Sequence, residues 1–171
     1  MKIIKGYIRV IDKINNKIGN LVSWVTLLLV LVVCYDVFTR YLLRESSVAL
    51  QELEWHLFAL IFLLAAAYTL QIDGHVRVDV IYSILSPKKK AWIDFVGSLI
   101  FLIPLCVMVI FASKDFVVTS FIMKETSPNP GGLPARYILK AVIPLSFFLL
   151  LLQGIALTFK SFIVIKEKKP D

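Results

Sequence analysis

The stretch Ile18-Gly-Asn-Leu-Val-Ser-Trp-Val-Thr-Leu-Leu-Leu-Val-Leu-Val-Val-Cys-Tyr35 decides the fold class. It contains no Asp, Glu, Lys or Arg. About 20 predominantly apolar helical residues cross a hydrocarbon core of about 30 Å. Three further stretches of the same kind follow, at residues 55–72, 95–112 and 141–159. The sequence therefore predicts an all-α membrane protein with four transmembrane helices.

The overall composition agrees with this prediction. Hydrophobic residues make up 58% of the 171 residues, charged residues make up 18%, and the mean hydropathy is +0.81. A soluble domain of this size needs a more charged exterior. The formal net charge of +7 does not indicate nucleic acid as a partner, because the basic residues border the apolar stretches instead of forming one face. Cys34 and Cys106 lie inside apolar stretches, without metal-ligand spacing, and we expect both to be packing residues.

Lys and Arg residues fall unequally on the two sides of the predicted spans. Thirteen of the 19 lie on the side that carries both termini and the connection between spans two and three, whereas six lie on the opposite side. Each side has six acidic residues, so the formal balance is +7 on the first side and zero on the second. Because cytoplasmic segments carry the excess of Lys and Arg, we predict that both termini are cytoplasmic.

Residues 1–17 form an amphipathic pattern ahead of the first span. Basic residues recur every three or four positions, opposite a face rich in isoleucine. We predict an interfacial helix on the anionic inner leaflet, with a simple basic tail as the alternative. Residues 160–171 are predicted to be a basic cytoplasmic tail, following a transmembrane domain of residues 18–159. The predicted anchors to membrane lipid are Lys2, Lys5, Arg9, Lys13, Lys17, Lys88, Lys89 and Lys90.

The connections between the spans have their own patterns. Residues 36–54 predict a short periplasmic interfacial helix, capped by Ser46 or Ser47, that leads into span two. Gly74 is expected to end span two, and Ser86-Pro87 is expected to start span three as a cap followed by proline at the first helical position. Prolines and glycines in the 125–134 segment exclude helix and strand and predict an ordered outer loop, with a plain linker as the alternative.

Transport or catalysis by this chain alone is not supported by its residues. Ionisable groups within a membrane are costly and mark ion or substrate pathways, but none lies near the centre of the four stretches. A stand-alone small transporter or channel and a membrane anchor of a redox enzyme are the alternatives. The two histidines, His56 and His75, would lie about 28 Å apart along one helix, too far to bind one haem iron. We expect no cofactor, and a larger membrane partner that supplies the polar pathway.

Several motifs then follow one another in a fixed order relative to the four spans. They are Gln51-Glu-Leu-Glu-Trp-His-Leu-Phe58, Asp73-Gly-His-Val-Arg-Val-Asp79, Ser86-Pro-Lys-Lys-Lys90, Glu125-Thr-Ser-Pro-Asn-Pro-Gly-Gly-Leu-Pro-Ala-Arg-Tyr137, and Ile143-Pro-Leu with Leu152-Gln-Gly154. In this order they resemble the small membrane subunit, DctQ-like, of tripartite ATP-independent periplasmic (TRAP) transporters. The resemblance covers residues 15–160.

The resemblance implies the small permease subunit of a sodium-coupled symporter for organic acid uptake, in the inner membrane of a bacterium. It implies two partners: a large multi-span permease subunit, which holds the substrate and sodium sites, and a periplasmic substrate-binding protein. It implies no enzyme activity and no catalytic, substrate-binding or metal-binding residue in this chain.

Residues for contact with these partners are assigned by their location. We expect Arg77 and Asp79 to order the cytoplasmic turn against the large subunit. Glu52, Glu54 and the 130–134 loop are expected near the docking surface of the binding protein, although solvated acids at the start of a span are the simpler alternative. The full set of predicted partner contacts is Gln51, Glu52, Glu54, His75, Arg77, Asp79, Pro130, Gly131, Gly132 and Pro134.

Overall fold

A computed structural model describes residues 2–74 and 84–166 of the chain. All regular elements in these two ranges are helical. The elements are α1 (Lys2–Phe38), η1 (Thr39–Leu43), α2 (Val48–Gln71), α4 (Pro87–Gly97), η2 (Ser98–Leu102), α5 (Ile103–Ile122) and α6 (Arg136–Lys166), of which η1 and η2 are single π-helical turns. They join into four rods long and apolar enough to cross a membrane. The predicted all-α membrane fold with four spans is confirmed.

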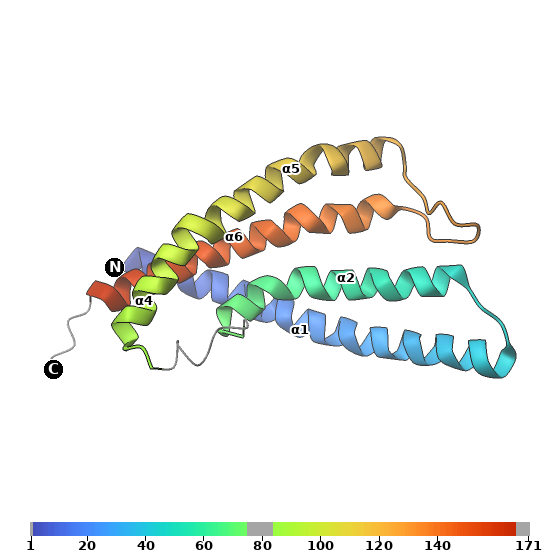
Figure 1. The fold of residues 1–171 in the computed structure, drawn as a ribbon, viewed down its shortest axis with the longest axis horizontal. Helices are drawn as coiled ribbons and strands as arrows, with labels where there is room; N and C mark the ends of the chain where they lie inside the picture. Colours follow the sequence, from blue (N-terminus) through green and yellow to red (C-terminus); the bar gives the residue numbers. More distant parts are fainter. Residues whose placement is uncertain (1, 75–83, 167–171) are drawn as a thin grey trace.

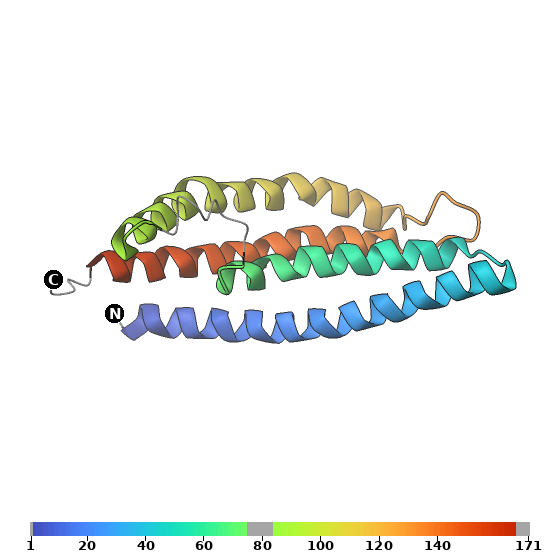
Figure 2. The same cartoon turned by 60° about the horizontal axis from the view of Figure 1, so that its bottom comes forward.

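The rods run alternately up and down, so both chain ends lie at the same end of the molecule (Figures 1 and 2). We call this end the inner end, and the opposite end, which carries connections 44–47 and 123–135, the outer end. The inner end carries the basic ends of α1, α4 and α6. By the charge count of the sequence, we expect the inner end to face the cytoplasm.

Helix α6 is the element on which the others pack. It contacts α1, α2, α4 and α5, and lies between α2 and α5 in Figure 1. Small side chains permit close approach of helices in a membrane, where burial of apolar surface does not drive association. Gly154 is one such site, because a Cβ there would lie 3.0 Å from Leu102 Cδ2. The buried small and hydroxyl residues of α6 are Ser146, Gly154, Ala156, Thr158 and Ser161.

The N-terminal segment differs from its prediction. Residues 2–17 are the first part of α1, which continues for 37 residues, and at 1.5 Å per residue the helix is about 55 Å long. Ile11 and Asn15 are buried, and this face of α1 packs against α6. The sequence predicts a separate helix on the leaflet, but residues 2–17 are the start of the continuous helix α1. The isoleucine-rich face that the sequence assigns to lipid contacts α6 instead. The five basic side chains of this segment remain exposed, so their anchoring to lipid stays a prediction.

Helix α2 takes in the short outer helix that the sequence predicts before span two. It begins at Val48, and Ser47 occupies the N-cap position without a side-chain capping hydrogen bond. At the inner end, Asp73 has a left-handed conformation (φ 56°), and the Gly74 N–H donates to Thr69 O at 2.9 Å. This is a Schellman ending, in which the left-handed residue is Asp73 and not the predicted Gly74.

The third rod, α4–η2–α5, begins as the sequence predicts and then contains a π turn. The Lys89 N–H donates to Ser86 Oγ at 3.5 Å, and Pro87 occupies the first turn. Pro104 has no N–H, and in a regular α-helix its ring would clash with the carbonyl four residues earlier. The preceding π turn, closed by the Ile103 N–H on Ser98 O, widens the helix at this point. The rod is visibly curved in Figures 1 and 2.

A close approach between α1 and α2 gives a first testable prediction. A Cβ on Gly19 would lie 2.8 Å from Cγ and Cδ2 of the Tyr68 ring. We expect Gly19→Ala to destabilise the fold by about 1–3 kcal/mol, because the ring must move within a packed interface. Thermal unfolding in detergent micelles measures this effect.

Gly6→Ala is the matched control, since nothing lies within 4 Å of a Cβ at Gly6, which is also helical. It should stabilise the fold by about 0.5–1 kcal/mol through helix propensity alone. Equal melting shifts in the two variants would show that the α1–α2 contact at Gly19 is not tight.

Candidate functional site

A buried carboxylate organises the outer end. Glu52 lies in the second turn of α2 and is only 3% exposed. Its carboxylate accepts hydrogen bonds from Ser127 Oγ, from Asn129 Nδ2 at 3.2 Å, and from the Leu133 N–H at 2.7 Å. All three donors belong to the connection between α5 and α6, so one α2 side chain holds this connection against the rest of the bundle. We call residues 123–135 the outer loop.

These hydrogen bonds also control the ionisation of Glu52. The Ser127 hydroxyl, followed by the Leu133 N–H, lowers the pKa of Glu52, whereas burial acts in the opposite direction; Asn129 and the positive charge of Arg136 lower the pKa further. A carboxylate that accepts several hydrogen bonds is favoured in its charged form. Glu52 is therefore ionised at neutral pH, and all three donors meet a full negative charge.

The stabilisation by Glu52 has a defined pH dependence. Because its folded pKa lies below the unfolded value of about 4.3, the contribution is complete above about pH 4.3 and is lost as the pH falls through the folded pKa. We expect the melting temperature of the wild-type chain to exceed that of Glu52→Gln by a constant margin between about pH 7 and about pH 5, and the margin to shrink below about pH 4. Circular dichroism melts over this range measure it. A margin that widens as the pH falls would contradict the assignment.

The outer loop has a compact backbone of its own. The Ser127 N–H donates to Leu133 O at 3.1 Å, and the Gly132 N–H donates to Asn129 O at 3.0 Å. Gly131 has φ 78°, a conformation that favours glycine. A Cβ on Gly132 would lie 2.5 Å from Ser127 Cβ and 2.8 Å from Glu52 Oε2. Gly131 therefore permits the left-handed turn, whereas Gly132 permits the close approach of its backbone to Ser127 and Glu52.

A second carboxylate fixes the two ends of the outer loop. Glu125 accepts a hydrogen bond from Ser120 Oγ at 2.6 Å and forms an ion pair with Lys140. Its backbone carbonyl accepts the Arg136 N–H at 3.0 Å, at the start of α6. Lys140, and then Ser120, lower the pKa of Glu125. In the sequence, Glu125 opens one of the family motifs, but nothing local predicts that its side chain bonds Ser120 and Lys140 on the two flanking helices.

The residues predicted to contact partners differ in their positions. Glu52 points inward, so its carboxylate is not available on an exposed face. Gln51 is exposed and donates to Ser46 Oγ at 3.1 Å. Glu54 is partly buried, and its Oε1 has no hydrogen-bond partner among the described residues. Pro130, Gly131 and Pro134 are exposed, while Gly132 is packed beneath them. His75, Arg77 and Asp79 lie outside the described residues.

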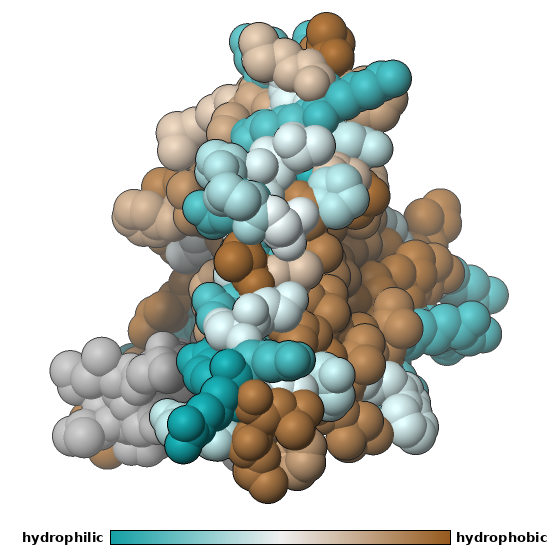
Figure 3. All heavy atoms as spheres, turned by 90° about the vertical axis from the view of Figure 1, so that its right-hand side faces the viewer, coloured by the Kyte–Doolittle hydropathy of each residue, from teal (hydrophilic) through white to brown (hydrophobic). Residues whose placement is uncertain are grey.

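Seen from the outside, this end differs from the flanks of the molecule. Figure 3 shows hydrophilic and weakly polar residues gathered in a band over the outer end, with hydrophobic residues alongside. Asp36 lies beneath the surface, 2% exposed, in an ion pair with Arg40 one turn further along the helix. The outer end is thus a polar surface whose loop is hydrogen-bonded to Glu52 beneath it.

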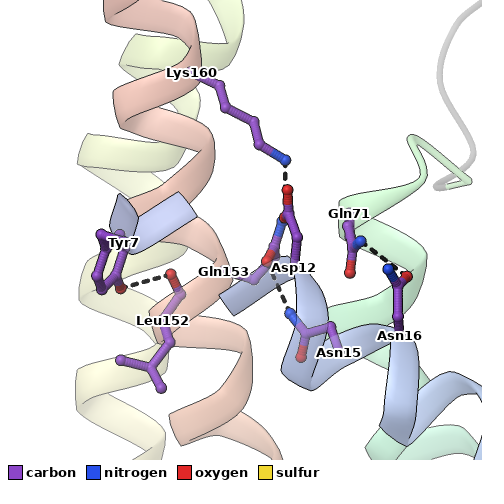
Figure 4. Close-up of polar contacts among 8 residues, drawn as sticks. All are labelled: Tyr7, Asp12, Asn15, Asn16, Gln71, Leu152, Gln153 and Lys160. Atoms are coloured by element: carbon purple, nitrogen blue, oxygen red, sulfur yellow. Dashed lines mark hydrogen bonds and ion pairs between the residues drawn. The ribbon is translucent and has the colours of Figure 1, made fainter. Parts of the chain in front are cut away.

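A second polar cluster joins α1 to α6 near the inner end (Figure 4). Asn15 Nδ2 donates to Gln153 Oε1 at 2.8 Å, and both side chains are 1% exposed. Lys160 Nζ lies 2.9 Å from Asp12 Oδ1. The Tyr7 hydroxyl donates to Leu152 O at 3.0 Å. Interhelical hydrogen bonds of this kind hold helices together where apolar surface cannot.

Two further polar pairs contribute to helix contacts. Gln71 Nε2 donates to Asn16 Oδ1 at 3.0 Å, across the exposed edge of α1 and α2. The hydroxyls of Ser98 and Thr158 lie 2.8 Å apart and join η2 to α6. Among the described residues, no three His, Cys, Asp or Glu side chains form a group able to hold a metal ion. The hydrogen-bonded polar side chains thus join α1 to α6, α1 to α2, η2 to α6, and α2 to the outer loop.

Comparison with known proteins gives one match. The family model described as "Tripartite ATP-independent periplasmic transporters, DctQ component" matches residues 29–163. This range covers α2, the α4–η2–α5 rod, the outer loop and most of α6, but only the outer part of α1. No curated protein and no solved structure gives a significant match.

Proposed function

The chain belongs to the DctQ component family of the tripartite ATP-independent periplasmic transporters, and we propose that it acts there as a scaffold for the large membrane subunit and helps to dock the periplasmic binding protein. Membership of this family makes the chain the small permease subunit of a transporter, and the family is a transporter component. The four apolar rods make it a multi-pass membrane protein. A TRAP transporter also contains a large membrane subunit and a binding protein, which are the partners of this component in general.

The scaffold role is supported by how little of the membrane-spanning surface the chain buries by itself. In the most apolar windows of the first three rods only 11% of residues are buried, against 33% in α6. The α4–η2–α5 rod packs on α6, and its other apolar side chains, among them Phe101, Met108 and Phe111, are exposed. Such surface must be covered by lipid or by another membrane protein. A large subunit with many spans is the partner that we propose for part of it.

The docking role is supported above all by the Glu52 anchor. A loop on the outer end that is held by three hydrogen bonds to one carboxylate loses little conformational entropy on binding a partner. Its exposed residues include Pro130, Gly131 and Pro134, which are rigid or small and leave the backbone accessible. We propose that these residues contact the binding protein.

The remaining features follow from the same family role. We propose that the transporter is a sodium-coupled symporter for organic acid uptake, located in a bacterial inner membrane. The substrate and sodium sites would lie in the large subunit. Arg77 and Asp79 would contact that subunit at the inner end.

Reconstitution with one component left out tests this function. Liposomes that contain the chain and the large subunit, with binding protein outside and an inward sodium gradient, should take up the substrate that the binding protein carries. Liposomes that lack the chain should show little uptake, and liposomes with the chain alone should show none. Equal uptake with and without the chain would refute the scaffold role.

A further inference from the structure

A half-open cavity lies between α2 and α5 near the outer end, with α6 as its floor. Its volume is about 400 Å³, within the range of about 300–1,000 Å³ that is usual for small-molecule pockets. Helices α2 and α5 each pack on α6. The lining residues are Trp55, His56, Ala59, Leu63, Phe116, Glu125, Arg136, Leu139, Lys140 and Ile143.

The lining changes character with depth. Arg136, the first residue of α6, and His56, in the third turn of α2, lie towards the outer end. Leu63 and Ile143 lie two turns further into the rods, where the cavity is apolar. A tryptophan at the polar margin, here Trp55, is typical of the level of lipid headgroups. The cavity therefore has the polarity profile of an amphiphile that enters from the leaflet at the outer end.

Two cationic side chains, Arg136 and Lys140, share the polar margin with the carboxylate of Glu125. Lys140 is paired with Glu125, and its Nζ lies 4.0 Å from the centre of the Phe116 ring. Arg136 lies over the Trp55 ring at 5.4 Å. Among residues 2–74 and 84–166 it forms no direct ion pair, although its charge lowers the pKa of Glu52 and of Glu125. A guanidinium offers a fork of N–H donors that matches phosphate oxygens. The guanidinium of Arg136, which has no direct carboxylate partner among the described residues, is the group of this margin that suits a phosphate.

We propose that this cavity binds one anionic glycerophospholipid, with its phosphate on Arg136 and an acyl chain along Leu63 and Ile143. The lipid would add a contact between α2 and α5, which each pack on α6. It would also lie directly below the start of the outer loop, because Glu125 and Arg136 belong both to the cavity and to the ends of that loop. The binding would thus stabilise the surface that faces the binding protein.

Tryptophan quenching by brominated lipid tests the proposal on the full chain. Trp24→Phe and Trp92→Phe remove two tryptophans that are exposed elsewhere and leave Trp55 as the reporter. In nanodiscs of phosphatidylcholine, brominated phosphatidylglycerol should quench Trp55 at a lower mole fraction than brominated phosphatidylcholine. Arg136→Gln should raise the half-saturating fraction of phosphatidylglycerol about tenfold, as expected when a charge-assisted contact is lost.

Two further variants make the test specific. Lys124→Gln removes an exposed cation of the outer loop that does not line the cavity, and it should leave the quenching curve unchanged. Ala59→Leu narrows the apolar part and should reduce quenching by both lipids while the melting temperature is retained. This variant keeps the test valid if Arg136→Gln fails to fold.

The contrary results are equally defined. Equal quenching by the two brominated lipids would show that Trp55 faces only bulk lipid, and would overturn the proposal. So would an Arg136→Gln curve that matches that of Lys124→Gln. Relief of quenching by inorganic phosphate would show that the margin prefers a free anion, which also contradicts a lipid site.

Discussion

Glu52→Gln should release the outer loop and reduce uptake by the complete transporter about tenfold or more, as the loss of a charge-assisted contact predicts. The amide offers one acceptor oxygen in place of two, and its NH₂ group faces donors from the loop. The three hydrogen bonds from Ser127, Asn129 and Leu133 therefore cannot all persist. At least one donor of the outer loop then lacks an acceptor, and an unmatched buried donor costs more than the loss of an exposed hydrogen bond.

Limited trypsinolysis measures the release directly. Lys124 lies at the start of the outer loop and is exposed, so cleavage after Lys124 should become faster in Glu52→Gln. The large subunit should still co-purify, because the spans are unchanged. Glu45→Gln is the matched control, since Glu45 is an exposed acid at the same end; it should cleave and transport like the wild-type chain. Unchanged cleavage and uptake in Glu52→Gln would show that transport does not depend on the attachment of the outer loop to Glu52.

The same release can be produced without changing any charge. Gly132→Ala places a methyl group 2.5 Å from Ser127 Cβ and 2.8 Å from Glu52 Oε2, so Ser127 or the loop must move. Gly131→Asn, one residue away, adds a larger side chain where nothing lies within 4 Å, and asparagine tolerates its φ of 78°. We expect Gly132→Ala to resemble Glu52→Gln and Gly131→Asn to retain a closed loop.

Replacement of the buried pair Asn15–Gln153 should loosen the first part of α1. Either Asn15→Leu or Gln153→Met leaves one buried polar group without its partner at 2.8 Å, at a cost of about 1–3 kcal/mol. The double variant should recover part of this loss, because two apolar groups of similar shape can pack against each other. A double-mutant cycle of unfolding free energies gives the coupling, which we expect to be about 0.6–1.7 kcal/mol.

Hydrogen exchange locates the effect within the chain. Amides of residues 2–17 should exchange faster in the single variants, while those of α5 should not change. Asn16→Ala provides the control, because Asn16 bonds Gln71 at the exposed edge of the bundle, and it should cost at most about 0.5 kcal/mol. Zero coupling between Asn15 and Gln153 would mean that α1 is held against α6 by packing alone.

The number of spans and several helix ends could be predicted from the sequence, because their causes are local. Long apolar stretches without charge must be helical in a membrane. Ser86 and Pro87 start a helix for reasons contained in the four consecutive residues 86–89. The outer loop could likewise be predicted as ordered coil, because glycine and proline restrict or free the backbone at their own positions.

What could not be predicted depends on residues that are distant in the chain. An amphipathic pattern over residues 2–17 suits a membrane surface and a neighbouring helix equally well, and the partner of Asn15 lies 138 residues away. The donors to Glu52 lie between 75 and 81 residues further on. A carboxylate that anchors a loop and one that is solvated look identical in sequence. For this reason the sequence predicts Glu52 as a residue that contacts a partner, but does not predict that its side chain points inward.

Mild-detergent purification of the tagged full chain, followed by mass spectrometry of the proteins that accompany it, tests the central claim most directly. We expect one large multi-span membrane protein in near-stoichiometric amount, recovered equally well with Glu52→Gln and less well with Arg77→Ala or Asp79→Ala. Recovery of the chain alone, with no multi-span partner under conditions that preserve its own fold, would contradict a scaffold subunit.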